Sequence, residues 1–383
     1  MTFTLLFWGS VVLVAYAYAG YPCALLALSR VTARRVQKRR ITPRATLIVT
    51  ARNEERRLKE KIDNTLAQDY PAPLLEIIVA SDCSTDRTDD IARAYGDRIR
   101  LVRAPERRGK EAAQQLAVAA ASGEILIFSD VATALLPDAV SSIVANFADP
   151  SVGCVSSVDR FVDADGRASG EGAYVRYEMW LRALETRVNS LVGLSGSFFA
   201  ARREVCRQWA ADRQSDFSTL LNAVERGWRG VLDADTAGYY RNIADTRRES
   251  HRKTRTVVRG IAVLARNARM LNPVRYGLFA WQLASHKLCR WLVPFAMIAA
   301  AIGSAGLASQ SAFYRAALAA QIGFYAAAAV GAATDAAALR IPAYLVTSNG
   351  AILVAWLRFA SGERVTCWTP SDRLAALPHT SSR

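Results

Sequence analysis

The chain has 383 residues, a formal net charge of +15 and 51% hydrophobic residues. This length corresponds to two or three units of ordinary domain size, and the hydrophobic content excludes an intrinsically disordered chain. A basic and hydrophobic composition is typical of a nucleic-acid-binding protein or of a membrane protein whose basic side faces the cytoplasm. The distribution of charge along the chain distinguishes these two classes.

The chain opens on an apolar segment. Residues 3–28 contain no charged side chain, and a helix of about 20 apolar residues crosses a bilayer. A cleavable signal peptide is the alternative, but residues 1–7 lack Lys and Arg and the apolar run exceeds a signal core. Basic residues crowd positions 30–40, so the positive-inside rule places that flank in the cytoplasm. We therefore expect an uncleaved transmembrane anchor at 1–29 and a basic cytoplasmic linker at 30–45.

Three further apolar segments lie near the C-terminus, at 292–308, 316–333 and 341–357. The first two would form an outward and returning pair of membrane helices. The third would leave the C-terminus outside, whereas Arg358 and Arg364 favour a cytoplasmic tail. Both topologies stay open on the sequence.

The middle of the chain alternates short β-rich runs with helical segments. The β-rich runs occupy 46–50, 75–80, 99–102 and 124–128, and the helical segments occupy 54–68, 85–95 and 111–121. This alternation predicts βαβ units and a mostly parallel sheet. In open sheets of this kind, ligands bind at the carboxyl ends of the strands.

Polar residues follow three of these runs, at 51–55, 81–88 and 129–133. We interpret Ser84 and Asp86 as caps of the next helix, because Ser and Asp are favoured at that position. Asp82 and Asp130 instead end apolar strands directly, at the expected ligand edge. Two acids at this edge are suited to a nucleotide and a divalent cation with oxygen ligands.

Short motifs of a recognisable kind follow one another along the chain. Those in the first half are TARNEE at 50–55, QDYP at 68–71, SDCSTDRT at 81–88, RGK at 108–110 and FSD at 128–130. Those in the second half are GLSG at 193–196, FAAR at 199–202, SDF at 215–217, RKTR at 252–255 and SHK at 285–287. In this order they resemble family 2 glycosyltransferases over about residues 45–295. The resemblance implies a GT-A fold and a nucleotide-sugar donor.

The resemblance also implies a donor site. The residues that would bind the donor nucleotide are Ala51, Arg52, Asn53, Glu54, Asp82, Lys110 and Asp130. The Asp82 carboxylate would accept the imino hydrogen of uracil. Asp130 would coordinate Mg²⁺ or Mn²⁺ bridging the donor's diphosphate, and the ion would neutralise the leaving group.

Two further residues receive catalytic roles from the resemblance. Asp216 would act as the general base on the acceptor hydroxyl, in a single inverting displacement. Arg255 would place positive charge beside the departing phosphate, for which a guanidinium group is well suited.

The sequence departs from the family at three positions. Ala132 stands where members carry a second acid or Asn, so a metal would depend on Asp130, the diphosphate, water or another ligand. Ser215 replaces a second acid. Val257 lies where processive synthases carry an aromatic residue, which argues against processive synthesis.

These observations predict an α/β GT-A domain with a mostly parallel sheet, between N-terminal and C-terminal transmembrane helices. The expected parts are the anchor at 1–29, the linker at 30–45, the GT-A domain at 46–258, an amphipathic interfacial segment at 259–285, transmembrane helices at 286–360 and a tail at 361–383. We expect a multi-pass protein of the bacterial cytoplasmic (inner) membrane with its catalytic domain in the cytoplasm.

The expected reaction transfers a sugar from a nucleotide-sugar donor, a UDP-sugar, to a glycan or lipid-linked acceptor in cell-surface or extracellular polysaccharide synthesis. A single-addition lipid-linked sugar transferase and a catalytically silent membrane scaffold are the alternatives. The expected partners are these substrates, the lipid bilayer and other components of polysaccharide synthesis or export. Nucleic acid is not expected, because the basic residues concentrate beside apolar spans.

Overall fold

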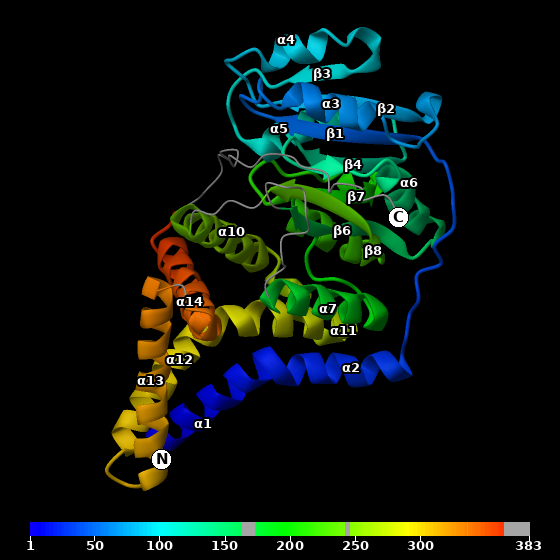
Figure 1. The fold of residues 1–383 in the computed structure, drawn as a ribbon. Coiled ribbons are helices and arrows are strands. Elements are labelled where there is room, and N and C mark those ends of the chain that lie inside the picture. Colours follow the sequence, from blue (N-terminus) through cyan, green and yellow to red (C-terminus); the bar gives the residue numbers. More distant parts are fainter. Residues whose placement is uncertain (163–172, 242–245, 335, 364–383) are drawn as a thin grey trace. The chain divides into compact units, whose positions relative to one another are not determined.

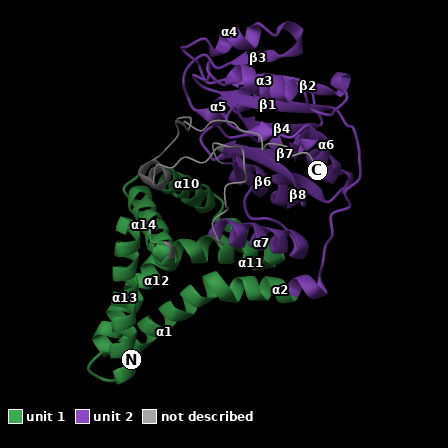
Figure 2. Ribbon diagram, in the orientation of Figure 1, with its two compact units in different colours: residues 1–27, 245–364 green, residues 28–244, 365–383 purple. Residues whose placement is uncertain are grey.

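The computed structural model describes residues 1–162, 173–241, 246–334 and 336–363. The chain forms two compact units, residues 1–27 with 245–364 and residues 28–244 with 365–383 (Figure 2). From residue 364 on, the predicted tail lies outside the described residues. The predicted domain limits stay a prediction, although the compact units divide at residue 245 and not at 258.

An eight-stranded sheet in the order β3-β2-β1-β4-β7-β6-β8-β5 forms the centre of the second unit (Figure 1). Its strands are β1 (Ala45–Ala51), β2 (Leu75–Ser81), β3 (Arg100–Arg103), β4 (Ile125–Asp130), β5 (Ala134–Leu135), β6 (Val152–Val162), β7 (Phe198–Arg202) and β8 (Arg229–Arg241). Strands β1 to β4 pair in parallel, as do β6 and β8. Strand β7 is antiparallel to β4 and β6, and β5 is antiparallel to β8. The predicted α/β fold with a mostly parallel sheet is confirmed, with a mixed second half.

Strand β1 explains why the ligand edge forms where the sequence places it. All seven of its residues are buried, since it lies between β2 and β4, as expected for a central parallel strand. The register pairs Ala51 with Ser81 and Thr50 with Asp130. The carboxyl ends of β1, β2 and β4 therefore meet at one edge, and the loops that follow them lie together.

The helices of this unit are α3 (Leu58–Leu66), α4 (Thr88–Arg93), α5 (Lys110–Ala120), α6 (Ala139–Ala145), α7 (Ala173–Val188), α8 (Arg203–Cys206) and α9 (Ser215–Glu225). The first helix was expected from residue 54 but begins at Leu58. Asn53 has a positive φ of 51°, and the amide of Glu54 donates to Thr88 Oγ1 at 2.7 Å. These residues therefore belong to a loop that is held by the next loop.

The first unit is helical. Its helices are α1 (Thr2–Ala15), α2 (Tyr21–Val31, which continues into the second unit), α10 (Thr246–Arg266), α11 (Pro273–Leu283), α12 (Arg290–Leu307), α13 (Ala312–Thr334) and α14 (Arg340–Ala360). Four helical runs are long and apolar enough to cross a membrane, at Thr2–Val31, Pro273–Leu307, Ala312–Thr334 and Arg340–Ala360. Three of the four predicted apolar segments lie within these runs, and the fourth, 292–308, ends one residue beyond Leu307.

Candidate active site

The loop after β1 is hydrogen-bonded to the loop after β2. Ala51 O accepts from the Asp82 amide at 3.0 Å, and Arg52 Nη1 donates to Asp82 O at 2.9 Å. Asn53 Oδ1 accepts from the Thr85 amide at 2.9 Å. The structure thus brings three of the four predicted loop residues beside Asp82, where their bonds shape the ligand edge.

Glu54, the fourth loop residue, is nearly fully buried, with 3% exposure. Its two carboxylate oxygens accept from Arg57 Nε and Nη2, each at 2.7 Å. Burial raises the pKa of Glu54 to about 7, against the opposing effect of Arg57. A carboxyl group at the ligand edge therefore exchanges a proton near neutral pH.

The two predicted helix caps differ in outcome. Asp86 precedes Arg87, the N-cap residue of α4, and its Oδ1 accepts from the amide of Thr88, the first residue of the helix, at 3.0 Å. The prediction for Ser84 is wrong, because its hydroxyl accepts from the Asn53 amide at 3.2 Å and contacts Ser81. Ser84 therefore joins the two loops instead of capping the helix.

Asp82 lies at the N-terminus of α5 and is fully buried. Its Oδ1 accepts from the amides of Arg108 and Gly109, both at 3.0 Å, and its Oδ2 lies 3.1 Å from the Gly109 amide. Gly109 has a positive φ of 98°, which a residue with a side chain adopts only at a cost. Because a carboxylate has about four lone-pair sites, this anchored group keeps the capacity to accept a further hydrogen bond.

Lys110 connects the ligand edge of the sheet to the loop that contains Gly196. It begins α5, and its Nζ lies 2.5 Å from Asp130 Oδ1 and 2.9 Å from Gly196 O. The Asp130 amide donates to Ser197 O at 3.0 Å, so the end of β4 and this loop are bound directly. The ammonium group thus lies between the predicted metal ligand and the loop before α9.

Asp216 reaches the same glycine from the other side. It lies in the first turn of α9, and its Oδ2 accepts from Gln214 Nε2 at 3.1 Å. A Cβ atom placed on Gly196 would lie 3.4 Å from Asp216 Oδ2. Three predicted site residues therefore meet around Gly196: Lys110, Asp130 and Asp216. Gly196 belongs to the sequence motif GLSG, but the sequence analysis gave it no role.

Arg255 belongs to α10, in the first unit, and is partly buried. Its role beside the departing phosphate stays a prediction.

The residues around Asp130 fit a metal that arrives with a substrate. In the part of the chain that the structure describes, no group of three His, Cys, Asp or Glu side chains could hold a metal ion. Ala132 offers no side-chain oxygen, and Lys110 contacts one oxygen of Asp130. Mg²⁺ is commonly bound through one or two carboxylates together with substrate phosphates. Asp130 can therefore serve as the protein ligand of an ion that is bound mainly by a diphosphate.

Lys61 is a buried charged residue that the sequence reasoning missed. It is 2% exposed, and its Nζ lies 2.7 Å from Ser129 Oγ and 2.6 Å from Thr133 O. A signal was present, because positions 58, 61, 62 and 65 share one face of a helix and residue 61 is the charged one among them.

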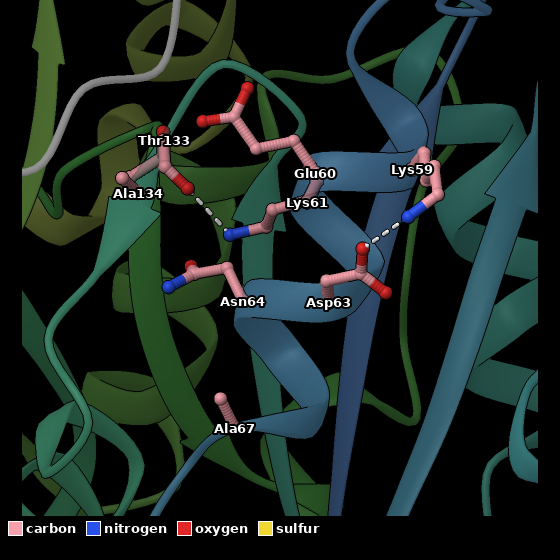
Figure 3. Close-up of a pocket in the computed structure, with 8 residues that line it drawn as sticks. All are labelled: Lys59, Glu60, Lys61, Asp63, Asn64, Ala67, Thr133 and Ala134. Atoms are coloured by element: carbon pink, nitrogen blue, oxygen red, sulfur yellow. Dashed lines mark hydrogen bonds and ion pairs between the residues drawn. The ribbon is translucent and has the colours of Figure 1, made fainter.

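A cavity of about 500 Å³ lies beside Lys61 (Figure 3). Its lining consists of Lys59, Glu60, Lys61, Asp63, Asn64, Ala67, Thr133 and Ala134. None of the predicted donor residues lines this cavity. It is therefore distinct from the ligand edge formed by the loops after β1, β2 and β4.

Comparisons with known proteins agree with this geometry. The sequence profile described as Glycosyl transferase family 2 matches residues 46–209, which is less than half of the chain. An N-acetylglucosaminyltransferase of Azorhizobium caulinodans is 29% identical over 190 residues, covering 48% of this chain and 46% of the relative. A beta-monoglucosyldiacylglycerol synthase of Nostoc sp. is 25% identical over 185 residues, covering 45% of this chain and 39% of the relative. The chain thus spans less than half the length of these curated relatives.

The fold recurs in a mannosyltransferase from Pyrobaculum calidifontis, solved in complex with GDP-Man and Mn²⁺. The TM-score is 0.72 at 24% identity, and the match covers 94% of this chain and all of the other. The GT-A type of fold thus extends to a solved structure of nearly the same extent. Over residues 46–209, the chain is thus similar to glycosyl transferase family 2.

Proposed function

We propose that this chain is an inverting glycosyltransferase that moves a sugar from a nucleotide-sugar donor to a glycan or lipid-linked acceptor in cell-surface or extracellular polysaccharide synthesis. The observation that carries the proposal is the meeting of Lys110, Asp130 and Asp216 around Gly196. Lys110, which would bind phosphate, and Asp216, which would remove a proton, then lie on either side of the loop that contains Gly196. A single displacement needs this arrangement, because the acceptor attacks opposite the leaving diphosphate.

In this proposal the loops after β1 and β2 bind the nucleotide. Asp82 is held by two backbone amides and accepts a hydrogen from the base. Lys110 places its ammonium group beside the diphosphate, where it stabilises the charge that develops as the sugar leaves. Mg²⁺ or Mn²⁺ held by Asp130 and the diphosphate would add Lewis-acid stabilisation of the same charge.

Asp216 removes the proton of the acceptor hydroxyl. Gln214 donates to one of its oxygens and so orients the carboxylate, and Gly196 places no side chain beside it. General-base catalysis of this kind contributes about 10²- to 10⁴-fold to the rate. Arg255 would add positive charge on the side of the departing phosphate.

The proposed donor is a UDP-sugar, in agreement with the acidic residue at position 82. The Pyrobaculum mannosyltransferase was solved with GDP-Man, so a guanine nucleotide belongs in every test. The four apolar helical runs support a multi-pass protein of the cytoplasmic membrane. The basic linker at 30–45 supports a cytoplasmic catalytic domain.

The test uses the full chain in nanodiscs with a panel of UDP- and GDP-sugars, with Mg²⁺, with Mn²⁺ and with EDTA. Donor consumption and transfer are measured for the wild type, for Asp216→Asn and for the exposed control Asp97→Asn. We expect Asp216→Asn to lower kcat by about 10²- to 10⁴-fold while donor binding is retained, and Asp97→Asn to resemble the wild type. Equal transfer by all three forms would disprove the role of Asp216.

A single addition to a lipid is a second candidate function. The Nostoc relative favours it, because a beta-monoglucosyldiacylglycerol synthase forms a glycolipid. Product size separates the two. One added sugar on a lipid-soluble product supports the second candidate, whereas a ladder or a high polymer supports chain synthesis and contradicts the argument from Val257.

A further inference from the structure

Lys61 binds both sides of the segment that carries Asp130. Its Nζ contacts Ser129 Oγ, one residue before Asp130, and Thr133 O, three residues after it; Figure 3 shows the contact to Thr133. The Thr133 amide donates back to Asp130 O at 3.1 Å. The ammonium group therefore closes the turn from Ser129 to Thr133 at both of its ends.

One helical turn later, Asn64 extends this attachment to β5. Its Nδ2 donates to Leu135 O at 2.8 Å, and its Oδ1 accepts from the Leu135 amide at 2.9 Å. The same face of α3 thus binds the chain from Ser129 to Leu135. Between these contacts lie Ala132 and Asp130, and Asp130 is the metal ligand of the proposed function.

The buried charge is costly, so its retention needs a reason. A lysine without water loses much of its solvation free energy, and an apolar residue of similar size is often tolerated better at such a site. Burial lowers the pKa of Lys61 to about 7, and the negative charge of Asp130 acts in the opposite direction. Asp130 thus lies within the field of Lys61 while it contacts Lys110 directly.

Ala132 increases the importance of this attachment. With no side-chain oxygen at position 132, Asp130 is the carboxylate of the segment, and a single ligand needs a fixed direction. Lys61 is chemically able to fix it, because an ammonium group donates up to three hydrogen bonds. Two of them go to the backbone and side chain on either side of Asp130.

We propose that Lys61 is a positioning residue of the donor site, which sets the position of Asp130 through Ser129 and Thr133 and so determines the affinity for the nucleotide diphosphate. This inference rests on the proposed function. Lys61 touches no substrate in this role and acts only through the segment 129–133.

The test measures binding of UDP and GDP to the full chain in nanodiscs by titration calorimetry, with Mn²⁺ and with EDTA. The variants are Lys61→Met and the matched control Lys59→Met, which removes an exposed lysine from the same helix. We expect Lys61→Met to weaken binding of the preferred nucleotide by about tenfold or more, and Lys59→Met to change it less than about twofold. Hydrogen exchange of residues 129–135 without nucleotide should accelerate in Lys61→Met alone.

A double-mutant cycle separates positioning from a general loss of stability. If Lys61 acts through Asp130, Lys61→Met has less than about a twofold further effect in an Asp130→Asn background. Ser129→Ala removes one partner of Lys61 and is expected to weaken binding by about threefold, which keeps the test decisive if Lys61→Met fails to fold.

The outcomes are distinguishable. Unchanged nucleotide affinity in folded Lys61→Met, or in Ser129→Ala if Lys61→Met does not fold, overturns the inference and leaves the proposed function in place. A full effect of Lys61→Met in the Asp130→Asn background also overturns it. A wild-type chain that binds neither nucleotide overturns the proposed function, and this inference with it.

Discussion

Lys110 is the residue at which the two halves of the proposed reaction meet. Its ammonium group contacts Asp130 on the donor side and the carbonyl of Gly196 on the acceptor side. A substitution at this position should therefore affect both the affinity for the leaving diphosphate and the position of the loop before Asp216.

We predict that Lys110→Met weakens binding of the nucleotide diphosphate by about 10- to 100-fold, since hydrogen bonds to charged groups contribute about 1.5–3 kcal/mol. Calorimetric titration with UDP and GDP measures this effect. Arg107→Met is the control, because this arginine is exposed in the same loop. An affinity equal to that of the wild type would show that Lys110 does not contact the diphosphate.

For single residues, the sequence predicted those placements that depend only on neighbouring positions in the chain. Asp82 and Asp130 follow β-rich runs directly, so their place at the ligand edge could be read from the chain. Lys61 and Gly196 could not be assigned in this way, because their partners are distant: Ser129 for Lys61, and Lys110 for Gly196. Ser84 was misassigned for the same reason. Its hydroxyl accepts from the amide of Asn53, which is distant in the sequence, and it does not cap the next helix.

Among the elements, the connection from α5 to β4 is held by a close backbone approach at Gly123. The Gly123 amide donates to Oγ1 of Thr46, a residue of β1, at 2.9 Å. A Cβ atom at this position would lie 2.5 Å from the backbone nitrogen of Thr46. Because a backbone atom cannot move aside as a side chain can, β1 and β4 would have to separate locally.

We predict that Gly123→Ala lowers the free energy of unfolding by about 1–3 kcal/mol, the range for overpacking a tight site. Thermal unfolding of the full chain in detergent measures this as a decrease in Tm. Ser122→Ala, one residue earlier and exposed, loses a 3.0 Å hydrogen bond to Glu76 and should cost about 1 kcal/mol or less. Equal Tm values for the two variants would contradict the close approach.

The limits of the elements show which local signals are reliable. The predicted strands at 46–50 and 75–80 agree closely with β1 and β2, because buried β-branched runs have few alternatives. Helix α3 starts later than predicted, since residues 53–57 form contacts with the loop after β2. Hydrogen bonds between two loops leave no periodic pattern in the sequence, so the pattern did not predict this later start.

For the whole molecule, stability should depend on pH through Lys61. Its pKa is lowered to about 7 by burial, so between pH 7 and 10.5 the unfolded chain binds a proton that the folded chain does not. The free energy of unfolding then rises with pH over this window, by up to about 1.4 kcal/mol per unit. Chemical unfolding at pH 6 to 9 without divalent ions, for the wild type and Lys61→Met, measures the difference. We expect this difference to be constant below pH 7 and to change above it. A constant difference throughout would contradict the lowered pKa of Lys61.

The helices of the first unit bear on the topology that the sequence left open. At one end of α12, Trp8 stacks on Phe313 with ring centroids 5.8 Å apart. At the other end, Arg290 lies over the Tyr18 ring at 6.0 Å. The run Thr2–Val31 leads into the basic linker, so the Arg290 end is the cytoplasmic one if that linker is cytoplasmic.

Contacts of α14 occur at this same end. Asn349 Nδ2 donates to Tyr18 OH at 3.1 Å, and Trp356 Nε1 donates to Trp291 O at 2.9 Å. Earlier in α14, the Tyr344 ring lies 4.3 Å from Lys253 Nζ on α10. The middle and the C-terminal part of α14 thus both lie at the start of α12, whereas a spanning helix would run toward the Phe313 end.

We therefore predict that α14 does not cross the membrane and that its C-terminal end at Ala360 is cytoplasmic, in agreement with the basic Arg358. Single cysteines at Ala360→Cys and Gln310→Cys, in a chain whose native cysteines are replaced by serine, test this with a membrane-impermeant maleimide. Both positions are exposed. Ala360→Cys should react in inverted vesicles and Gln310→Cys in right-side-out vesicles, because the turn between α12 and α13 lies at the opposite end. Reaction of Ala360→Cys from outside would mean that α14 spans the bilayer, and the Arg358 charge would then violate the positive-inside rule.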